Sequence, residues 1–278
     1  MPIQLSKSDH PNKPTTQSYE HPIPESTAEN DQHNSNGSSL NLINKFSYMN
    51  IQGLCPQTIP SKVPFIEDIL TPEKQLFFGL SETWLQSHKD AELTIKGYTI
   101  FRCDTTRKKK STRGRLTGGV ALYVRDDIAC SSEVIASYST DAIQSLCLYS
   151  KTENLAIAVL YRQPDDSHHG HPSTPANFKK ALNQLKNPLL KISPAPDIVL
   201  GGDFNLPHAV WPGGSARPGA SPQEREMINA LNDISNELFL SQLVEGPTHK
   251  DGNTLDLVLV NNTEPVSYTH LTLPTRKL

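Results

Sequence analysis

Asp203 and Asn205 are the residues of this chain whose type and spacing most clearly suggest chemistry. They follow the apolar run 198–200, which is typical of a buried strand, and two glycines that would let a backbone or a substrate approach closely. If the strand geometry continues, side chains two residues apart point to the same side, so a carboxylate and a carboxamide would lie together. Such a pair suits a phosphate, because one group can hold a metal or orient a water while the other hydrogen-bonds an oxygen. The alternative is a strand that runs into an Asx-turn.

Three further polar residues, Asn50, Glu82 and Tyr161, lie at the ends of apolar segments. Glu82 is a candidate Mg²⁺ ligand, because a hard cation prefers carboxylate oxygen. Asn50 could assist the metal or a phosphate oxygen, and the Tyr161 hydroxyl could donate to a phosphate. Each residue also has a structural explanation: an exposed glutamate that caps the next turn, a turn asparagine at a strand exit, and a buried core tyrosine.

The length of 278 residues and the formal net charge of −3 fit one large α/β domain or two small ones. Basic residues are concentrated in the short segment 102–115. The N-terminus has no apolar signal-peptide core, and no run is long and apolar enough to span a membrane. The four cysteines have no Cys-x-x-Cys spacing, so we expect reduced thiols and an intracellular protein.

Local patterns predict many strands with a few helices between them, which favours a layered α/β sandwich. Residues 1–44 are rich in Ser, Asn, Pro and Thr and are expected to be a disordered tail. One helix should begin at Pro175, after the N-cap Thr174, and another should begin at the capping box Ser221–Glu224. Both helices carry apolar stripes that should pack on a sheet. A short helix is expected at 63–70. The strands are expected at 46–52, 76–80, 98–103, 119–124, 143–149, 155–161 and 254–260.

Six short motifs are the basis of a family resemblance. They are Asn50–Leu54, Gly79–Leu85, Gly118–Val124, Leu160–Arg162, Gly202–Asn205 and Thr254–Leu257. In this order they resemble the endonuclease/exonuclease/phosphatase family, and most closely the apurinic-like endonuclease domain of non-LTR (LINE-type) retrotransposons. The resemblance covers roughly residues 46–266, and we place the corresponding domain at residues 45–266. It implies an α/β (α+β) fold, a four-layered sandwich of two β-sheets flanked by helices, with the active site at one rim and Mg²⁺ (or Mn²⁺) as cofactor.

The resemblance also implies roles for single residues. Glu82 and Asn50 would hold the metal, and Asp203 would orient or deprotonate the attacking water. Asn205 and Tyr161 would donate hydrogen bonds to the scissile phosphate.

Further residues would support the site or contact double-stranded DNA. Asp256 would hydrogen-bond a catalytic histidine and fix its tautomer, and Thr248 would support the site. The expected DNA contacts are basic and bind phosphates: Arg162, Lys108, Lys109, Lys110, Arg113 and Arg115. Arg162 could instead pair with a structural carboxylate, and the basic loop could be a solvated or localisation-like cluster.

The resemblance leads us to expect a histidine within a Ser-Asp-His motif near the C-terminus, and no such motif occurs. We expect residues 267–278 to be a non-native tail, and a native but divergent end is the alternative. In either case we expect the last strand to be missing and a sheet edge to be exposed. His270 should lie too close behind the preceding strand to reach the site. His249 and His208 are therefore the candidates for a substitute base.

The predicted function is Mg²⁺-dependent nicking of target DNA, which yields a 3′-hydroxyl primer for reverse transcription, with low activity in this fragment. In the parent element a reverse transcriptase domain would lie on the same chain, and the nucleus is the expected location. Two alternatives stay open. One is a non-catalytic remnant or DNA-binding fragment, and the other is a phosphatase or phosphodiesterase of the same superfamily that acts on a small molecule or lipid.

Overall fold

A computed structural model describes residues 46–55, 60–70, 75–86, 88, 90–106, 117–165, 173–262 and 269–270. All of these residues belong to one compact unit, Ser35–Leu278. The tail predicted at 1–44 and the basic residues of the loop 107–116 lie outside the described residues, as does most of the segment 267–278. The four cysteines are free thiols, as predicted.

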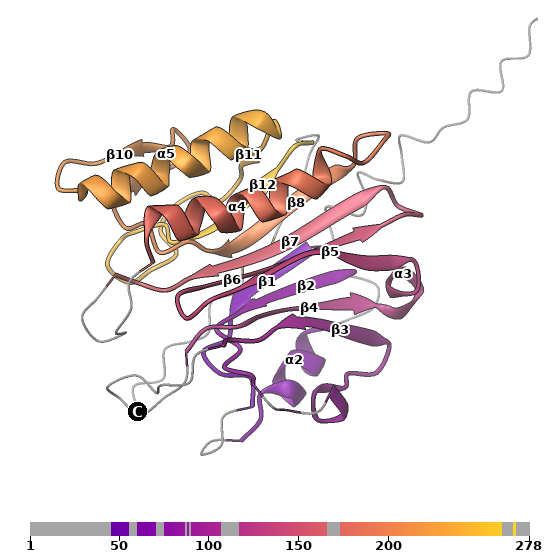
Figure 1. Cartoon of the computed structure of the whole chain (residues 1–278). Helices are drawn as coiled ribbons and strands as arrows, with labels where there is room; N and C mark the ends of the chain where they lie inside the picture. The colour runs from indigo at the N-terminus through magenta and orange to yellow at the C-terminus, as the bar shows by residue number, and fades with distance from the viewer. Residues whose placement is uncertain are drawn as a thin grey trace, which may run out of the picture. The chain divides into compact units, whose positions relative to one another are not determined.

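Two mixed sheets form the centre of this unit (Figure 1). The five-stranded sheet has the order β13 (Thr269–His270), β1 (Phe46–Asn50), β2 (Phe77–Ser81), β4 (Val120–Arg125) and β3 (Tyr98–Cys103). The six-stranded sheet has the order β11 (Ser241–Gln242), β12 (Asp256–Val260), β8 (Asp197–Asp203), β7 (Leu155–Arg162), β6 (Ile143–Ser150) and β5 (Ser132–Ser139). The predicted fold class, mixed α/β with two large sheets and flanking helices, is confirmed.

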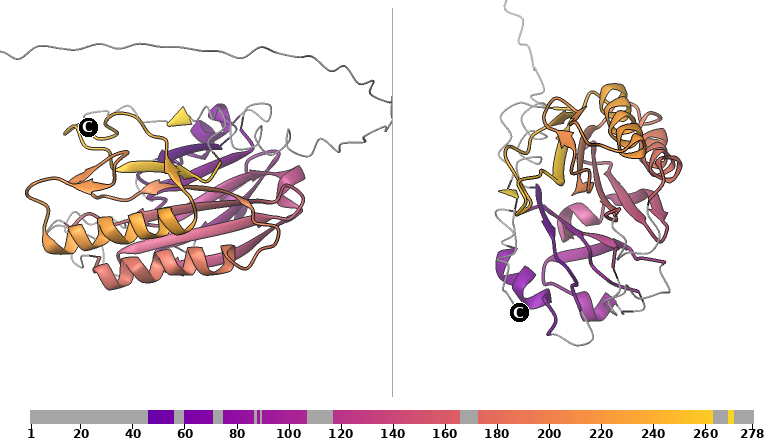
Figure 2. Two further views of the ribbon diagram at one scale, coloured as in Figure 1. Left: turned by 90° about the horizontal axis from the view of Figure 1, so that it is seen from above. Right: turned by 90° about the vertical axis from the view of Figure 1, so that its left-hand side faces the viewer.

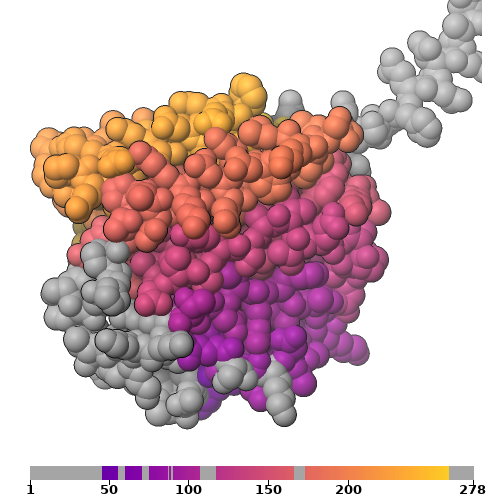
Figure 3. Space-filling model, viewed as in Figure 1, coloured from indigo at the N-terminus to yellow at the C-terminus, as the bar shows by residue number. Residues whose placement is uncertain are grey.

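Helices cover the outer faces of the two sheets. α4 (Pro175–Leu189) and α5 (Pro222–Glu237) lie side by side over the six-stranded sheet and form much of the surface there (Figures 2 and 3). α2 (Val63–Ile69) and the 3₁₀ turn η1 (Asp90–Leu93) belong to the five-stranded half, and α3 (Asp126–Ala129) follows β4.

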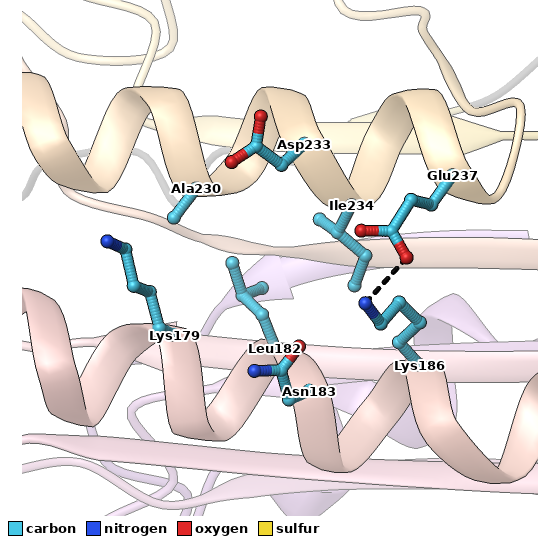
Figure 4. A pocket seen from close by; sticks show the side chains of 8 residues that line it. All are labelled: Lys179, Leu182, Asn183, Lys186, Ala230, Asp233, Ile234 and Glu237. Atoms are coloured by element: carbon cyan, nitrogen blue, oxygen red, sulfur yellow. Dashed lines mark hydrogen bonds and ion pairs between the residues drawn. The ribbon is translucent and has the colours of Figure 1, made fainter.

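The long helices begin where the sequence predicted. The Thr174 side chain accepts a hydrogen bond from the Asn177 N–H at 3.2 Å, and Ser221 accepts one from the Glu224 N–H at 3.1 Å. The apolar stripes of both helices are buried against the sheet, as predicted. A shallow groove on their outer side is crossed by an ion pair between Lys186 and Glu237 at 2.6 Å (Figure 4).

A second core fills the space between the two sheets. A side chain is impossible at Gly201, because a Cβ there would lie 2.8 Å from Cζ of Phe46 on the opposite sheet. The expected close approach is therefore to the opposite sheet at Gly201, and at Gly202 it is to the Leu160 carbonyl of the neighbouring strand β7.

Several elements were not predicted. β5 was missed because its residues are mostly half-exposed and carry no apolar alternation. The Gly-rich segment 213–219 begins within a small hairpin, β9 (Ala209–Val210) with β10 (Ser215–Ala216).

The backbone of β13 pairs in parallel with β1, with Tyr48 opposite His270. β13 therefore lies in the sheet that carries Asn50. The expectation that His270 does not reach the site stays a prediction.

Candidate active site

Four polar side chains from four strands converge at one rim of the two sheets. The Asn50 amide nitrogen donates to Asp203 Oδ2 at 2.8 Å and to Glu82 Oε1 at 3.0 Å. Asp256 lies directly opposite Asp203 in the antiparallel pair of β12 and β8. The right panel of Figure 2 looks onto this side of the molecule. The fold therefore brings together residues that are up to 206 positions apart in the sequence, from Asn50 to Asp256.

The strands end at the rim in an unusual backbone conformation. Glu82 has a φ of 52° and Asn205 a φ of 48°, and Gln52 and Trp84 are also left-handed. This region is uncommon for residues other than glycine and costs of order 1–3 kcal/mol per residue where it is strained. Such residues cluster at functional sites, where the surrounding structure holds them in place.

Glu82 is held at both carboxylate oxygens. Asn50 donates to Oε1, and the indole Nε1 of Trp84 donates to Oε2 at 3.2 Å. The Trp84 ring lies against the backbone of Gly53, where a Cβ would be 2.4 Å from the ring carbon Cε3. Trp84 was part of a sequence motif but was not predicted as a site residue. Its signal was its position two residues after the predicted metal ligand.

Lys62 is a second residue at the rim that the sequence did not indicate. Its Nζ donates to the carbonyls of Ile51 and Gln52, and the Gln52 N–H donates to Asn50 Oδ1 at 3.3 Å. Burial lowers the pKa of Lys62, while the nearby charge of Glu82 acts in the opposite direction. Lys62 therefore fixes the turn after Asn50 and places a positive charge near the rim.

Asp203 and Asn205 lie together, but not for the predicted reason. β8 ends at Asp203, so the strand alternation does not extend to Asn205. Instead, the Asn205 N–H donates to Asp203 Oδ1 at 3.2 Å, as in the Asx-turn that was the alternative. The Asn205 side-chain amide donates to the Arg162 carbonyl at 2.6 Å.

The site is strongly negative and largely buried. The pKa of Asp203 is raised well above its ordinary value, first by burial and then by the negative charges of Asp256 and Glu82. Hydrogen bonds from Asn50 and from the Asn205 N–H oppose this shift.

Tyr48 lies next to the same charges and was also missed. Its hydroxyl is within 2.6 Å of Ser81 Oγ. Burial, followed by the charges of Asp256 and Asp203, raises the pKa of this phenol. A tyrosine in an apolar strand pattern gives no sequence signal for such a position.

Arg162 is not a DNA contact in this structure, which corrects the prediction. Its side chain is 0% exposed. The guanidinium donates to the Phe204 carbonyl at 2.8 Å, to the Asn205 carbonyl, and to Asp165 Oδ1 at 2.8 Å and the Ser173 hydroxyl. Arg162 therefore holds the turn that carries Asn205, and its carboxylate partner is structural.

Tyr161 and Thr248 lie in the same region. Tyr161 is opposite Asp203 in the parallel pair of β7 and β8 and is 1% exposed. The Thr248 hydroxyl accepts hydrogen bonds from the backbone N–H groups of Leu255 and Asp256 at 2.9 and 3.0 Å. Thr248 thus fixes the backbone at the start of β12.

The two histidines considered as substitute bases both have carboxylate partners. His208 Nδ1 lies 2.7 Å from Glu224 Oε2, and His249 Nδ1 lies 3.4 Å from Asp251 Oδ2. His208 follows Asn205 by three residues.

The basic residues predicted to bind DNA, 108–110, Arg113 and Arg115, lie outside the described residues. The described end of this loop lies at the rim. The N–H groups of Thr83 and Trp84 donate to the carbonyls of Gly119 and Gly118 at 3.2 and 2.9 Å. The loop therefore leads directly to the turn that carries Glu82.

Sequence comparison finds a family similarity in the C-terminal part of the chain. Residues 155–275 match the family model described as endonuclease-reverse transcriptase. The match contains Asp203, Asn205 and Asp256. Through these residues this part of the chain is similar to the endonuclease/exonuclease/phosphatase family. Enzymes of this superfamily hydrolyse phosphodiesters or phosphate esters.

Several solved structures are similar to this chain. An endonuclease/exonuclease/phosphatase family protein from Bacteroides thetaiotaomicron has 12% identity and a TM-score of 0.46, over 78% of this chain and 80% of that one. The endonuclease domain of TRAS1, a telomere-specific non-LTR retrotransposon, has 18% identity and a TM-score of 0.42, over 77% of this chain and 82% of that one. An AP endonuclease from Archaeoglobus fulgidus has 14% identity and a TM-score of 0.44, over 78% of this chain and 86% of that one. The likeness to the family is therefore carried by the sequence match at residues 155–275. No curated protein matches the chain.

Enzymes of this family generally depend on a divalent metal, and the donor set at the rim fits a hard cation. Mg²⁺ binds through one or two carboxylates and keeps several waters. Within the described ranges, no three His, Cys, Asp or Glu side chains are grouped closely enough to hold an ion by themselves. Glu82 would hold the metal together with water and the Asn50 amide. The Asn50 nitrogen now lies between two carboxylates, and rotating the amide would present its oxygen instead.

None of the helices in the described part of the chain has the length and hydrophobicity that crossing a bilayer requires.

Proposed function

We propose that this chain is a Mg²⁺- or Mn²⁺-dependent endonuclease domain that nicks one strand of double-stranded DNA, as part of a non-LTR retrotransposon. The observation that carries the proposal is the convergence of Asn50, Glu82 and Asp203 within hydrogen-bonding distance at one rim. The match to the endonuclease-reverse transcriptase family favours a nuclease over other phosphoesterases. A reverse transcriptase on the same parent chain would use the product, and the nucleus is where such a substrate lies.

Asp203 acts as the group that accepts a proton from the attacking water. Burial and two neighbouring negative charges raise its pKa, which makes the carboxylate a stronger base. The water oxygen forms a bond to phosphorus, and the bond from phosphorus to the 3′ oxygen breaks. The strand that leaves takes up a proton and ends in a 3′-hydroxyl, and the other end keeps the phosphate.

Asn205 and Tyr161 are the proposed donors to the phosphate oxygens. One Asn205 amide proton is used by the Arg162 carbonyl, and the amide group has a second proton for a substrate. A divalent cation at Glu82 supplies positive charge that offsets the charge of the phosphate. Asp256 adds a negative charge directly opposite Asp203 and favours proton uptake by that carboxylate.

Double-stranded DNA is the proposed partner because of the basic loop. Its charges lie in the segment 107–115, and the chain returns from it at Gly118 and Gly119 beside the Glu82 turn. Phosphate contacts from such a loop would position the duplex on the rim without reading its sequence.

Plasmid nicking in Mg²⁺ tests this proposal. Glu82→Ala should abolish nicking and leave the melting temperature near that of the wild type, because the residue contributes a metal ligand. Glu92→Ala is the matched control, since it removes an exposed carboxylate from η1. Nicking by the Glu82 variant at the wild-type rate would contradict the proposal.

Two other outcomes have separate meanings. Hydrolysis of a phosphorylated sugar or lipid headgroup without nicking would indicate a phosphatase of the same superfamily. Binding of a duplex without cleavage, in any metal, would indicate a non-catalytic DNA-binding fragment.

A further inference from the structure

Glu224 does not complete the capping box that its sequence position predicts. Ser221 accepts the Glu224 N–H, as expected, but the Glu224 carboxylate is directed elsewhere. Its Oε1 accepts the His208 backbone N–H at 2.9 Å, and its Oε2 lies 2.7 Å from His208 Nδ1. The Glu224 side chain is 7% exposed and that of His208 is 42% exposed. A buried carboxylate therefore holds an exposed imidazole at two points, which the helix cap does not require.

Two arginines are linked to His208 through backbone carbonyls and form a basic cluster with it. The Arg217 N–H donates to the His208 carbonyl at 2.7 Å, so both residues lie on the hairpin of β9 and β10. The Arg217 guanidinium lies 3.5 Å from Asn253 Oδ1, at the long end of the hydrogen-bond range. Arg225 donates to the carbonyls of Ala220 and Arg217, both at 3.2 Å.

The cluster lies close to the candidate active site. His208 follows Asn205 by three residues, so their Cα atoms are at most about 11 Å apart. In Figure 1, β10 and the beginning of α5 lie at the side where β7 and β8 end. A duplex strand carries one phosphate per about 3.4 Å of axis, so about 11 Å corresponds to two or three nucleotides.

We propose that His208 and Arg217 bind a backbone phosphate of the nucleic-acid strand, two or three nucleotides from the bond that is cut. Glu224 and Arg225 are positioning residues for this site. The inference rests on the proposed function, because it names a contact of the same substrate.

The chemistry of the two contacts matches a phosphate. The planar Arg217 guanidinium can donate two parallel hydrogen bonds to phosphate oxygens. Glu224 engages Nδ1 of the His208 imidazole, which leaves Nε2 for the phosphate. Arg225 directs its guanidinium to two backbone carbonyls, so it fixes the hairpin.

Duplex binding at several salt concentrations in EDTA tests this site without any cleavage. Each phosphate contact contributes close to ~0.9 to the slope of log K against log salt. Arg217→Gln should therefore lower the slope by about 0.9, and Arg217→Gln with His208→Gln should lower it further. Arg125→Gln is the matched control, because Arg125 is at the far end of β4 and pairs with Asp127 at 2.7 Å. The control should leave the slope unchanged.

Glu224→Gln separates positioning from folding. It should lower the salt slope as His208→Gln does, and the two changes together should add nothing further. A purely structural role would lower the melting temperature and leave the slope unchanged, which would contradict the inference.

The failure of this inference and that of the proposed function can be distinguished. Wild-type binding with an unchanged slope in Arg217→Gln would overturn only the phosphate site. Absence of any duplex binding by the wild type would overturn the proposed function and this site with it.

Discussion

Arg162 offers the sharpest test of how this rim is held together. Arg162→Met keeps much of the length of the side chain and removes the guanidinium. Two buried backbone carbonyls, those of Phe204 and Asn205, then have no donor from this side chain. An unsatisfied buried acceptor costs about 1–3 kcal/mol, so the pair costs about 2–6 kcal/mol. The bond to Asp165, which is 40% exposed, adds little.

A loss of this size is large against a total stability of about 5–15 kcal/mol. Each kilocalorie lowers the melting temperature of a domain of this size by roughly 2–4 °C, so a loss of about 3 kcal/mol corresponds to roughly 6–12 °C. Urea unfolding followed by tryptophan fluorescence measures the effect, because Trp84 and Trp211 report on the rim and the hairpin. Arg125→Met is the control and should change stability by less than about 1 kcal/mol.

Activity should fall together with stability. Arg162 holds the turn that places Asn205, so nicking should be abolished even at temperatures where the variant remains folded. Arg162→Lys should not restore it, because one ammonium cannot reach both carbonyls and Asp165 as the guanidinium does. A variant that melts like the wild type but binds DNA with a smaller salt slope would refute this reasoning. Arg162 would then be a DNA contact after all.

Two further predictions concern charge. In EDTA the pKa of Asp203 is higher in the folded than in the unfolded chain, so wild-type stability should fall as the pH rises above the ordinary value of 3.8 and through the folded-state pKa. Asp203→Asn should not show this decrease, and at neutral pH it should melt at a higher temperature than the wild type. Thermal melts at several pH values measure both effects. A variant that melts at a lower temperature than the wild type at neutral pH would contradict the predicted direction. Neutralising Lys108, Lys109 and Lys110 together should reduce the slope of log K against log salt for duplex binding. The reduction should be ~0.9 for each of these lysines that binds a phosphate. An unchanged slope would mean that the loop is solvated.

Much of the fold was predictable from local patterns. β3 and the hairpin of β6 and β7 occur within one residue of the predicted ranges, because their apolar content marks them clearly. The caps Thr174 and Ser221 marked the starts of α4 and α5. β5 was missed because an edge strand with exposed polar residues carries no such pattern.

Some residues of the candidate site were predictable, but their geometry was not. Polar residues at strand ends pointed to Asn50, Glu82 and Asp203. The left-handed turn at Asn205 and the burial of Arg162 depend on contacts between distant segments. A single sequence cannot distinguish an arginine that binds phosphate from one that binds two carbonyls, because either can stand at the end of a strand.

The electrostatics of the rim emerges only in the folded chain. Asp203, Asp256 and Glu82 come from three strands, and the fold places their charges close enough to raise the proton affinity of Asp203. The Asn50 amide lies between two of these carboxylates and offsets part of their repulsion. A divalent cation at Glu82 would offset more of it. Metal affinity and the basicity of Asp203 are therefore linked, because each positive charge added at the rim lowers the pKa of that carboxylate.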